Sequence, residues 1–219
     1  YIYMLIGLYP VTPIISPWLQ QASKRELEGY LGLWIITTFL PYIHLVYPEV
    51  LGEAFWNDTP LLYYFTGFIG YFILGYYLKR FGYPSAALSW IILIVGFALS
   101  AGIFCSRIDT VPTVPELELS WGFCTVNVFL MTLGLFSLIG RLSLKGKNAT
   151  CKLLSDISIK SYGMYLAHIL FLNFYYGLFK SISDAAYVTI PLIAVCTFIT
   201  VYIFVYLLSY LPKSKYIIG

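Results

Sequence analysis

The sequence predicts an all-helical protein that crosses a lipid bilayer several times, and three observations carry this prediction. Hydrophobic residues make up 60% of the 219 residues and charged residues only 11%, with a mean hydropathy of +0.82. A soluble domain is usually about a quarter charged. The apolar residues gather in stretches of about 20, the length that a helix needs to span the hydrocarbon core. The alternating pattern of membrane β-barrels, over segments of about ten residues, is absent.

Seven spans are predicted, at about residues 1–18, 27–47, 61–79, 86–105, 121–140, 161–180 and 187–211. Alternate connections between them are basic, and they carry Lys24 and Arg25, then Lys79 and Arg80, then Arg141, Lys145, Lys147 and Lys152, and finally Lys213 and Lys215. The other connections, around 49–58 and 109–118, are mostly acidic, with Arg107 and Lys180 as the exceptions. The positive-inside rule therefore predicts a cytoplasmic C-terminus. The net charge of +3 reflects this topology and does not indicate nucleic-acid binding.

Seven spans that end in the cytoplasm begin on the outer side, here at Tyr1 within an apolar run. We therefore expect this chain to be the C-terminal portion of a longer protein with an odd number of earlier spans. Residues 1–219 themselves are predicted to form a single membrane domain, because the sequence shows neither repeats nor low-complexity tracts.

The first two spans carry distinct features. Pro10, Pro13 and Pro17 free backbone carbonyls in the first span, so we expect a kink or an early helix end there, followed by a polar connection at 20–28. His44 closes the second span among aromatic residues. An aromatic belt at the membrane interface explains it without a function.

Small residues recur in the third and fourth spans, including Gly67, Gly70 and Gly96, and predict close helix packing. Cys105 and Cys124 fall near the outer ends of adjacent spans. A disulfide between them is conceivable, although isolated membrane cysteines are usually packing residues. The four cysteines show no metal-ligand spacing, so we expect no metal site.

The connection from Arg141 to Lys160 is the most basic part of the chain, and its middle, 148–159, is expected to form a short interfacial helix. Topology alone explains its positive charge. The alternative is that Lys145, Lys147 and Lys152 bind the phosphates of a nucleotide. The last span is predicted to be uniformly apolar.

The span at 161–180 differs because a polar stripe runs along it. Ser161, Tyr165, His168 and Tyr175 recur at spacings of four, three and seven, which puts them on one helix face. His168 lies eight residues beyond Lys160, about 12 Å into the membrane. An ionisable side chain at such a depth suggests a functional site. A hydrogen bond to a neighbouring helix is the structural alternative.

Three stretches of the sequence, YIYMLIGLYPVTPII, SYGMYLAHILF and LPKSKYIIG, resemble the membrane-bound acyltransferase family 3. The similarity is greatest to the bacterial inner-membrane O-acetyltransferases of envelope sugars, and it extends over the whole chain in order. The resemblance implies about ten spans, of which three precede this chain with an essential His. It also implies transfer of an acyl group, usually acetyl from cytoplasmic acetyl-CoA, to a hydroxyl of a polysaccharide or lipid-linked sugar.

The motif SYGxYLxH carries residue roles over to this chain. The resemblance implies a catalytic part for His168 and Tyr165 and substrate binding by Ser161, Tyr162 and Tyr9. The three loop lysines are our candidates for binding the phosphates of acyl-CoA. Acyl transfer needs a base for the alcohol proton and a donor for the developing oxyanion. An imidazole with a tyrosine one turn away provides both kinds of group. We expect His168 to support a principal base in the preceding spans.

Two other functions remain open from the sequence. Spans interrupted by proline and a buried His also suit a transporter or flippase, with His168 in the substrate pathway. Alternatively, the polar stripe binds a partner helix in a non-catalytic subunit.

Overall fold

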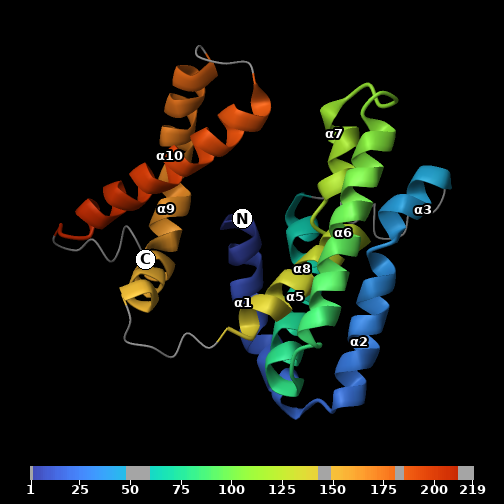
Figure 1. The fold of residues 1–219 in the computed structure, drawn as a ribbon. Helices are drawn as coiled ribbons and strands as arrows, with labels where there is room; N and C mark the ends of the chain where they lie inside the picture. The colour runs from blue at the N-terminus through green and yellow to red at the C-terminus, as the bar shows by residue number, and fades with distance from the viewer. Residues whose placement is uncertain (1, 48–59, 143–148, 181–184, 212–219) are drawn as a thin grey trace. The chain divides into compact units, whose positions relative to one another are not determined.

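The computed structural model describes residues 2–47, 60–142, 149–180 and 185–211 (Figure 1). Every regular element in these ranges is a helix, which confirms the all-helical prediction. The helices belong to two compact units, Tyr1–Ser143 and Leu144–Gly219.

The first unit begins with α1, Ile2–Gln21, which contains Pro10, Pro13 and Pro17. The expected early end at these prolines is therefore wrong. One carbonyl within α1 gains a side-chain partner, because the Thr12 hydroxyl donates a hydrogen bond to the Leu8 carbonyl at 2.8 Å.

The C-terminal end of α1 is held by Arg80 of α5, Pro60–Phe81. Its guanidinium donates hydrogen bonds to the carbonyls of Leu19, at 2.9 Å, and Ala22, at 3.1 Å. The last carbonyls of a helix have no partner within the helix, so a cation placed there stabilises the end.

The second predicted span consists of two helices, α2 at Lys24–Thr37 and α3 at Leu40–Val46. The break follows from hydrogen bonding. The Thr37 and Thr38 hydroxyls each donate to a carbonyl of the preceding turn, at 2.6 Å, and the Thr38 carbonyl accepts the backbone N–H of Val126 at 3.1 Å. The backbone at Thr38 thus joins another segment of the chain instead of continuing its helix.

Helices α6, Ala86–Arg107, and α8, Val126–Gly140, pack against each other more extensively than any other described pair. Glycines permit the contact, as predicted for Gly96. A Cβ atom on Gly134 would lie only 2.7 Å from the Ser89 carbonyl oxygen, and one on Gly96 only 2.8 Å from that of Asn127. The connection between α6 and α8 contains α7, Val114–Leu117, and the short 3-10 helix η1, Glu118–Trp121.

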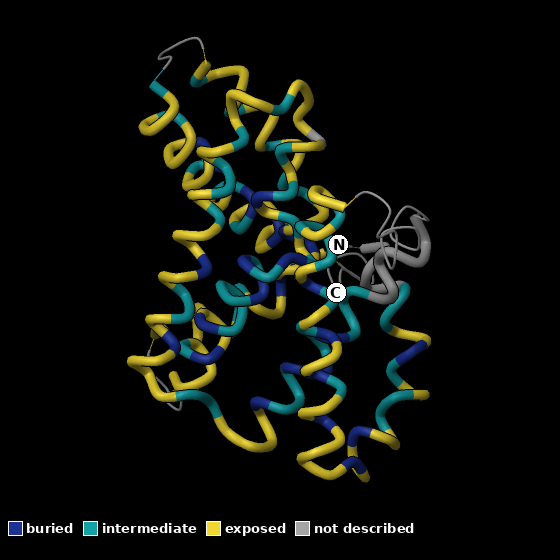
Figure 2. Tube along the Cα trace, turned by 90° about the vertical axis from the view of Figure 1, so that its right-hand side faces the viewer, coloured by how far each residue is buried: buried dark blue, intermediate teal, exposed yellow. Residues whose placement is uncertain are grey.

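The core of the first unit forms around Trp34 and Leu27 of α2 and Ile73 of α5. The Trp34 ring fills the space beside Gly70, and its Nε1–H donates to the Gly67 carbonyl at 3.1 Å. Figure 2 shows buried and exposed positions interspersed along the helices, and large apolar side chains such as Leu33 and Ile36 of α2 are exposed. Apolar side chains exposed on this scale are typical of helices that face lipid.

The second unit contains α9, Ala149–Lys180, and α10, Ala186–Leu208, which cross each other (Figure 1). Met164 of α9 packs against Val201 and Val205 of α10. The separate interfacial helix predicted at 148–159 is wrong, because residues 149–159 form the first turns of α9 itself.

Four stretches among the described residues are long and apolar enough to cross a bilayer, namely Lys24–Val46, Ala86–Arg107, Glu118–Gly140 and Ala186–Leu208. They match the second, fourth, fifth and seventh predicted spans. Helix α9 is not among the four, because its polar side chains lower its mean hydropathy. All four cysteines are free, so Cys105 and Cys124 form no disulfide.

Candidate functional site

A cavity of about 270 Å³ lies between α9 and α10 within the second unit. Three members of the predicted polar stripe, Ser161, Tyr165 and His168, line it along α9 together with Ile157 and Met164. Thr197, Phe198 and Val201 line it along α10. The lining on α9 runs over the twelve residues from Ile157 to His168, about 16 Å of helix. The structure therefore brings most of the stripe together at one concave site with largely apolar walls.

The hydrogen bonding of His168 assigns the proton of its ring. Nδ1 lies within hydrogen-bond distance of the Tyr165 carbonyl oxygen, one turn earlier on α9. A carbonyl can only accept, so Nδ1 carries the hydrogen and Nε2 of the neutral imidazole carries the lone pair. No described residue hydrogen-bonds Nε2. The ring is half-buried and thus presents an acceptor for a proton at the cavity.

Thr197 is the polar residue of the cavity wall that the sequence analysis missed. It is buried in α10, and its hydroxyl Oγ1 has no hydrogen-bond partner among the described residues. A helical threonine usually bonds a carbonyl of the preceding turn. The available signal was a set of three threonines in an otherwise apolar helix, Thr189, Thr197 and Thr200, and the helix was instead interpreted as uniformly apolar.

Other predicted site residues lie elsewhere. Tyr162 is 40% exposed and does not line the cavity. Tyr175, the fourth member of the stripe, shares a hydrogen bond of 2.7 Å with Thr200 of α10, as expected of a residue that joins two helices. Tyr9 belongs to the first unit, where its side chain is 73% exposed.

The loop lysines are only partly described. Lys145 and Lys147 lie outside the described residues, whereas Lys152 is exposed on the first turn of α9. Within the described parts of the chain, no three His, Cys, Asp or Glu side chains cluster as metal ligands would.

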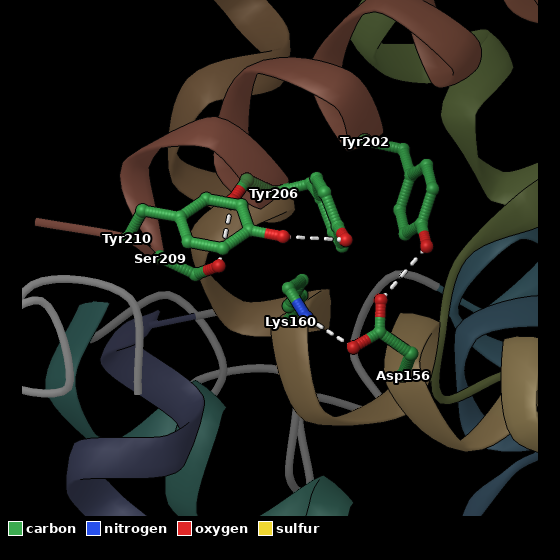
Figure 3. A network of polar contacts seen from close by, with 6 residues as sticks. All are labelled: Asp156, Lys160, Tyr202, Tyr206, Ser209 and Tyr210. Atoms are coloured by element: carbon green, nitrogen blue, oxygen red, sulfur yellow. Dashed lines mark hydrogen bonds and ion pairs between the residues drawn. The ribbon is translucent and has the colours of Figure 1, made fainter.

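A polar cluster joins α9 to α10 near the start of α9 (Figure 3). Asp156 forms an ion pair with Lys160 one turn later and accepts a hydrogen bond of 2.7 Å from the Tyr202 hydroxyl. The buried Lys160 ammonium also lies 5.2 Å from the centre of the Tyr206 ring. Both donors, Lys160 first, hold the pKa of Asp156 below its ordinary value. The cluster joins α10 to α9 next to Ile157, the first residue of α9 that lines the cavity.

The arrangement offers a proton acceptor and an unpartnered hydroxyl in an apolar recess. Electrostatic interactions strengthen where water is excluded. Nucleophilic attack on a carbonyl needs a hydroxyl donor and a basic nitrogen, and the wall of this cavity contains groups of both kinds.

The comparisons with known proteins agree with this chemistry. Residues 1–210 match the acyltransferase family 3 profile, which is described as an acyltransferase domain. No curated protein and no solved structure matches the chain. Because the profile covers nearly all of the 219 residues, the chain belongs to the acyltransferase family 3 and is a membrane acyltransferase.

Proposed function

We propose that this chain is part of an O-acyltransferase that moves an acyl group from cytoplasmic acyl-CoA to a hydroxyl of a cell-envelope polysaccharide or a lipid-linked sugar. Acetyl is the group that the resemblance implies. The observation that carries the proposal is the position of His168, with Nε2 free to accept a proton at the cavity between α9 and α10.

The chemistry assigns a direction to each proton. The acceptor hydroxyl oxygen attacks the thioester carbonyl carbon, and its proton passes to the base. The carbon–sulfur bond then breaks, and the departing thiolate takes up the proton to leave free CoA. His168 supports this transfer, and Tyr165 orients it through the carbonyl that binds Nδ1. Ser161, Tyr162 and Tyr9 bind substrate, while Lys145, Lys147 and Lys152 bind the phosphates of the donor.

The proposal includes the setting of the reaction. The chain is the seven-span C-terminal part of a ten-span protein, forms one functional domain, and lies in a bacterial inner membrane with its C-terminus in the cytoplasm. The helical fold and the apolar helices described above support this arrangement. The positive charge of alternate connections supports the cytoplasmic position of the C-terminus.

Replacing His168 tests the proposal in cells. The His168→Ala variant should reduce hydroxylamine-labile acyl esters on envelope glycans by about 100-fold, because general acid–base catalysis contributes about that much or more. His44→Ala is the matched control, since it removes the other histidine of the chain. Esters at the wild-type level in His168→Ala cells would refute the catalytic assignment. Uptake of a sugar into vesicles without ester formation would favour a transporter.

A further inference from the structure

We infer that the cavity between α9 and α10 binds the hydrocarbon chain of the donated acyl group, with room for about ten carbons, and that Thr197 binds its carbonyl oxygen. This inference rests on the proposed function and extends the donor beyond acetyl. Volume, lining and two polar groups support it.

The size of the cavity exceeds the need of an acetyl group. An apolar protein cavity of about 150 Å³ accommodates benzene, with its six carbons. At the same packing, about 270 Å³ accommodates a chain of about ten carbons.

The lining favours a hydrocarbon over a polar substrate. Ile157, Met164, Phe198 and Val201 present only apolar groups to the cavity. A sugar or an amide-rich pantetheine arm would leave several hydrogen-bonding groups unpaired against these walls, at a cost of about 1–3 kcal/mol for each. An alkyl chain incurs no such cost.

The two polar residues, His168 and Thr197, mark where the acyl chain begins, at its carbonyl carbon. His168 is the last lining residue on α9, and Thr197 is the first on α10. Both residues line the cavity, one from each helix, and we place the start of the acyl chain at the end that they occupy. A thioester carbonyl at this end would supply the partner that the Thr197 hydroxyl lacks. This hydroxyl is buried, and a rotation about χ1 is the change that would turn it toward the ligand.

Photo-crosslinking tests whether the acyl chain lies in the cavity. The probe is a decanoyl-CoA with a diazirine and an alkyne near the end of the chain, applied to the intact protein in its membrane. Mass spectrometry should find the crosslink on peptides that contain Ile157 or Val201, the lining residues farthest along each helix from His168 and Thr197. Excess decanoyl-CoA should compete with the probe, whereas acetyl-CoA at the same concentration should compete at least ten-fold less. Crosslinks confined to other helices would overturn the inference.

A substitution that fills the cavity provides a second test, and the same substitution outside the cavity is its control. Ser161 lines the cavity and is exposed, so Ser161→Leu should fill it without disturbing the fold. Ser158→Leu makes the same change one turn earlier at an exposed position outside the lining. We expect Ser161→Leu to lower crosslinking and thiol release from decanoyl-CoA at least ten-fold more than thiol release from acetyl-CoA. Ser158→Leu should change neither. Equal effects on the two donors would contradict a chain-binding role.

Two conservative substitutions of Thr197 test its role. Thr197→Val keeps the volume and removes the hydroxyl, whereas Thr197→Ser keeps the hydroxyl. Loss of one donor to a developing oxyanion costs about 100-fold or more in kcat. Thr197→Val should therefore lose kcat with every donor while KM changes little, and Thr197→Ser should retain activity. Full activity of Thr197→Val would remove Thr197 from the inference.

The outcomes separate this inference from the proposed function. Absence of ester formation from every donor between two and sixteen carbons would overturn the acyltransferase proposal itself. Ester formation from acetyl-CoA alone, without a crosslink in the second unit, would leave that proposal intact and overturn the chain-binding cavity.

Discussion

Among single residues, Gly70 shows most clearly how the absence of a side chain determines packing. A Cβ atom there would lie 1.9 Å from Cε2 of Trp34, a residue that is 6% exposed and bonded to the Gly67 carbonyl. The indole cannot withdraw without losing that hydrogen bond. Its ring also meets the rings of Tyr71 and Phe129 edge to face, at 4.8 and 5.4 Å between centroids.

Gly70→Ala should therefore destabilise the protein by about 1–3 kcal/mol, the usual cost of overpacking a core. The measurement is the thermal unfolding midpoint in detergent. Gly102→Ala is the matched control, because no atom lies within 4 Å of its added Cβ atom. Alanine favours a helix interior over glycine by about 1 kcal/mol, so the control should be neutral or stabilising. A loss of stability in the control equal to that of Gly70→Ala would refute the packing argument.

Sequence reasoning performs well on some residues and poorly on others, for a physical reason. Helical periodicity places Ser161, Tyr165 and His168 on one face, because spacing within one helix follows from local geometry. Thr197 depends on how α10 meets α9, a tertiary contact that no pattern within either helix encodes. The glycines predicted close packing, but only the structure distinguishes Gly70, which has a neighbour, from Gly102, which has none.

At the scale of helices, the cluster of Asp156, Lys160 and Tyr202 joins α9 to α10. Lys160 is buried, so removal of the Asp156 charge leaves its ammonium without an ionic partner. Asp156→Asn should destabilise the second unit by about 1–3 kcal/mol. The thermal unfolding midpoint in detergent at neutral pH measures this loss.

The exposed pair of Lys24 and Glu28 provides the control. It has the same spacing, and Glu28 also accepts a hydrogen bond from a tyrosine, Tyr77. Its side chains are 56% and 49% exposed, so Glu28→Gln should cost less than about 1 kcal/mol. A loss for Asp156→Asn no larger than that for Glu28→Gln would show that the buried pair adds nothing.

The pH dependence of this cluster has a definite sign. A carboxylate whose pKa is lowered in the folded state stabilises that state above the pKa of the unfolded chain, about 3.9. Its contribution disappears as the pH falls through the lowered pKa of the folded state. The difference in unfolding midpoint between wild type and Asp156→Asn should thus stay constant from pH 7 to 5 and narrow below about pH 4. A difference that grows as the pH falls would contradict this assignment.

Helix boundaries show the same limit on sequence reasoning. Three prolines suggested a kink or an early end of the first helix, yet α1 reaches Gln21, and Arg80 binds the carbonyls of Leu19 and Ala22 at that end. The break at Thr38 likewise depends on Val126, which is distant in the sequence. Each of these boundaries is decided by a partner from another element.

For the whole molecule, charge predicts an orientation that labelling can test. In a background without the four native cysteines, Asp109→Cys should react with a membrane-impermeant maleimide in intact cells. Lys152→Cys should react only after the membrane is opened. Both positions are exposed, so a difference between them reports the side of the membrane. Labelling of both in intact cells would contradict the topology derived from the basic connections.

The central claim is that His168 of a membrane acyltransferase acts in acyl transfer. Release of free CoA thiol from acyl-CoA by the purified intact protein in lipid nanodiscs tests it most directly. The account predicts that His168→Ala slows this release about 100-fold, with an unchanged unfolding midpoint and with wild-type release in His44→Ala. Equal release rates in wild type and His168→Ala would contradict it.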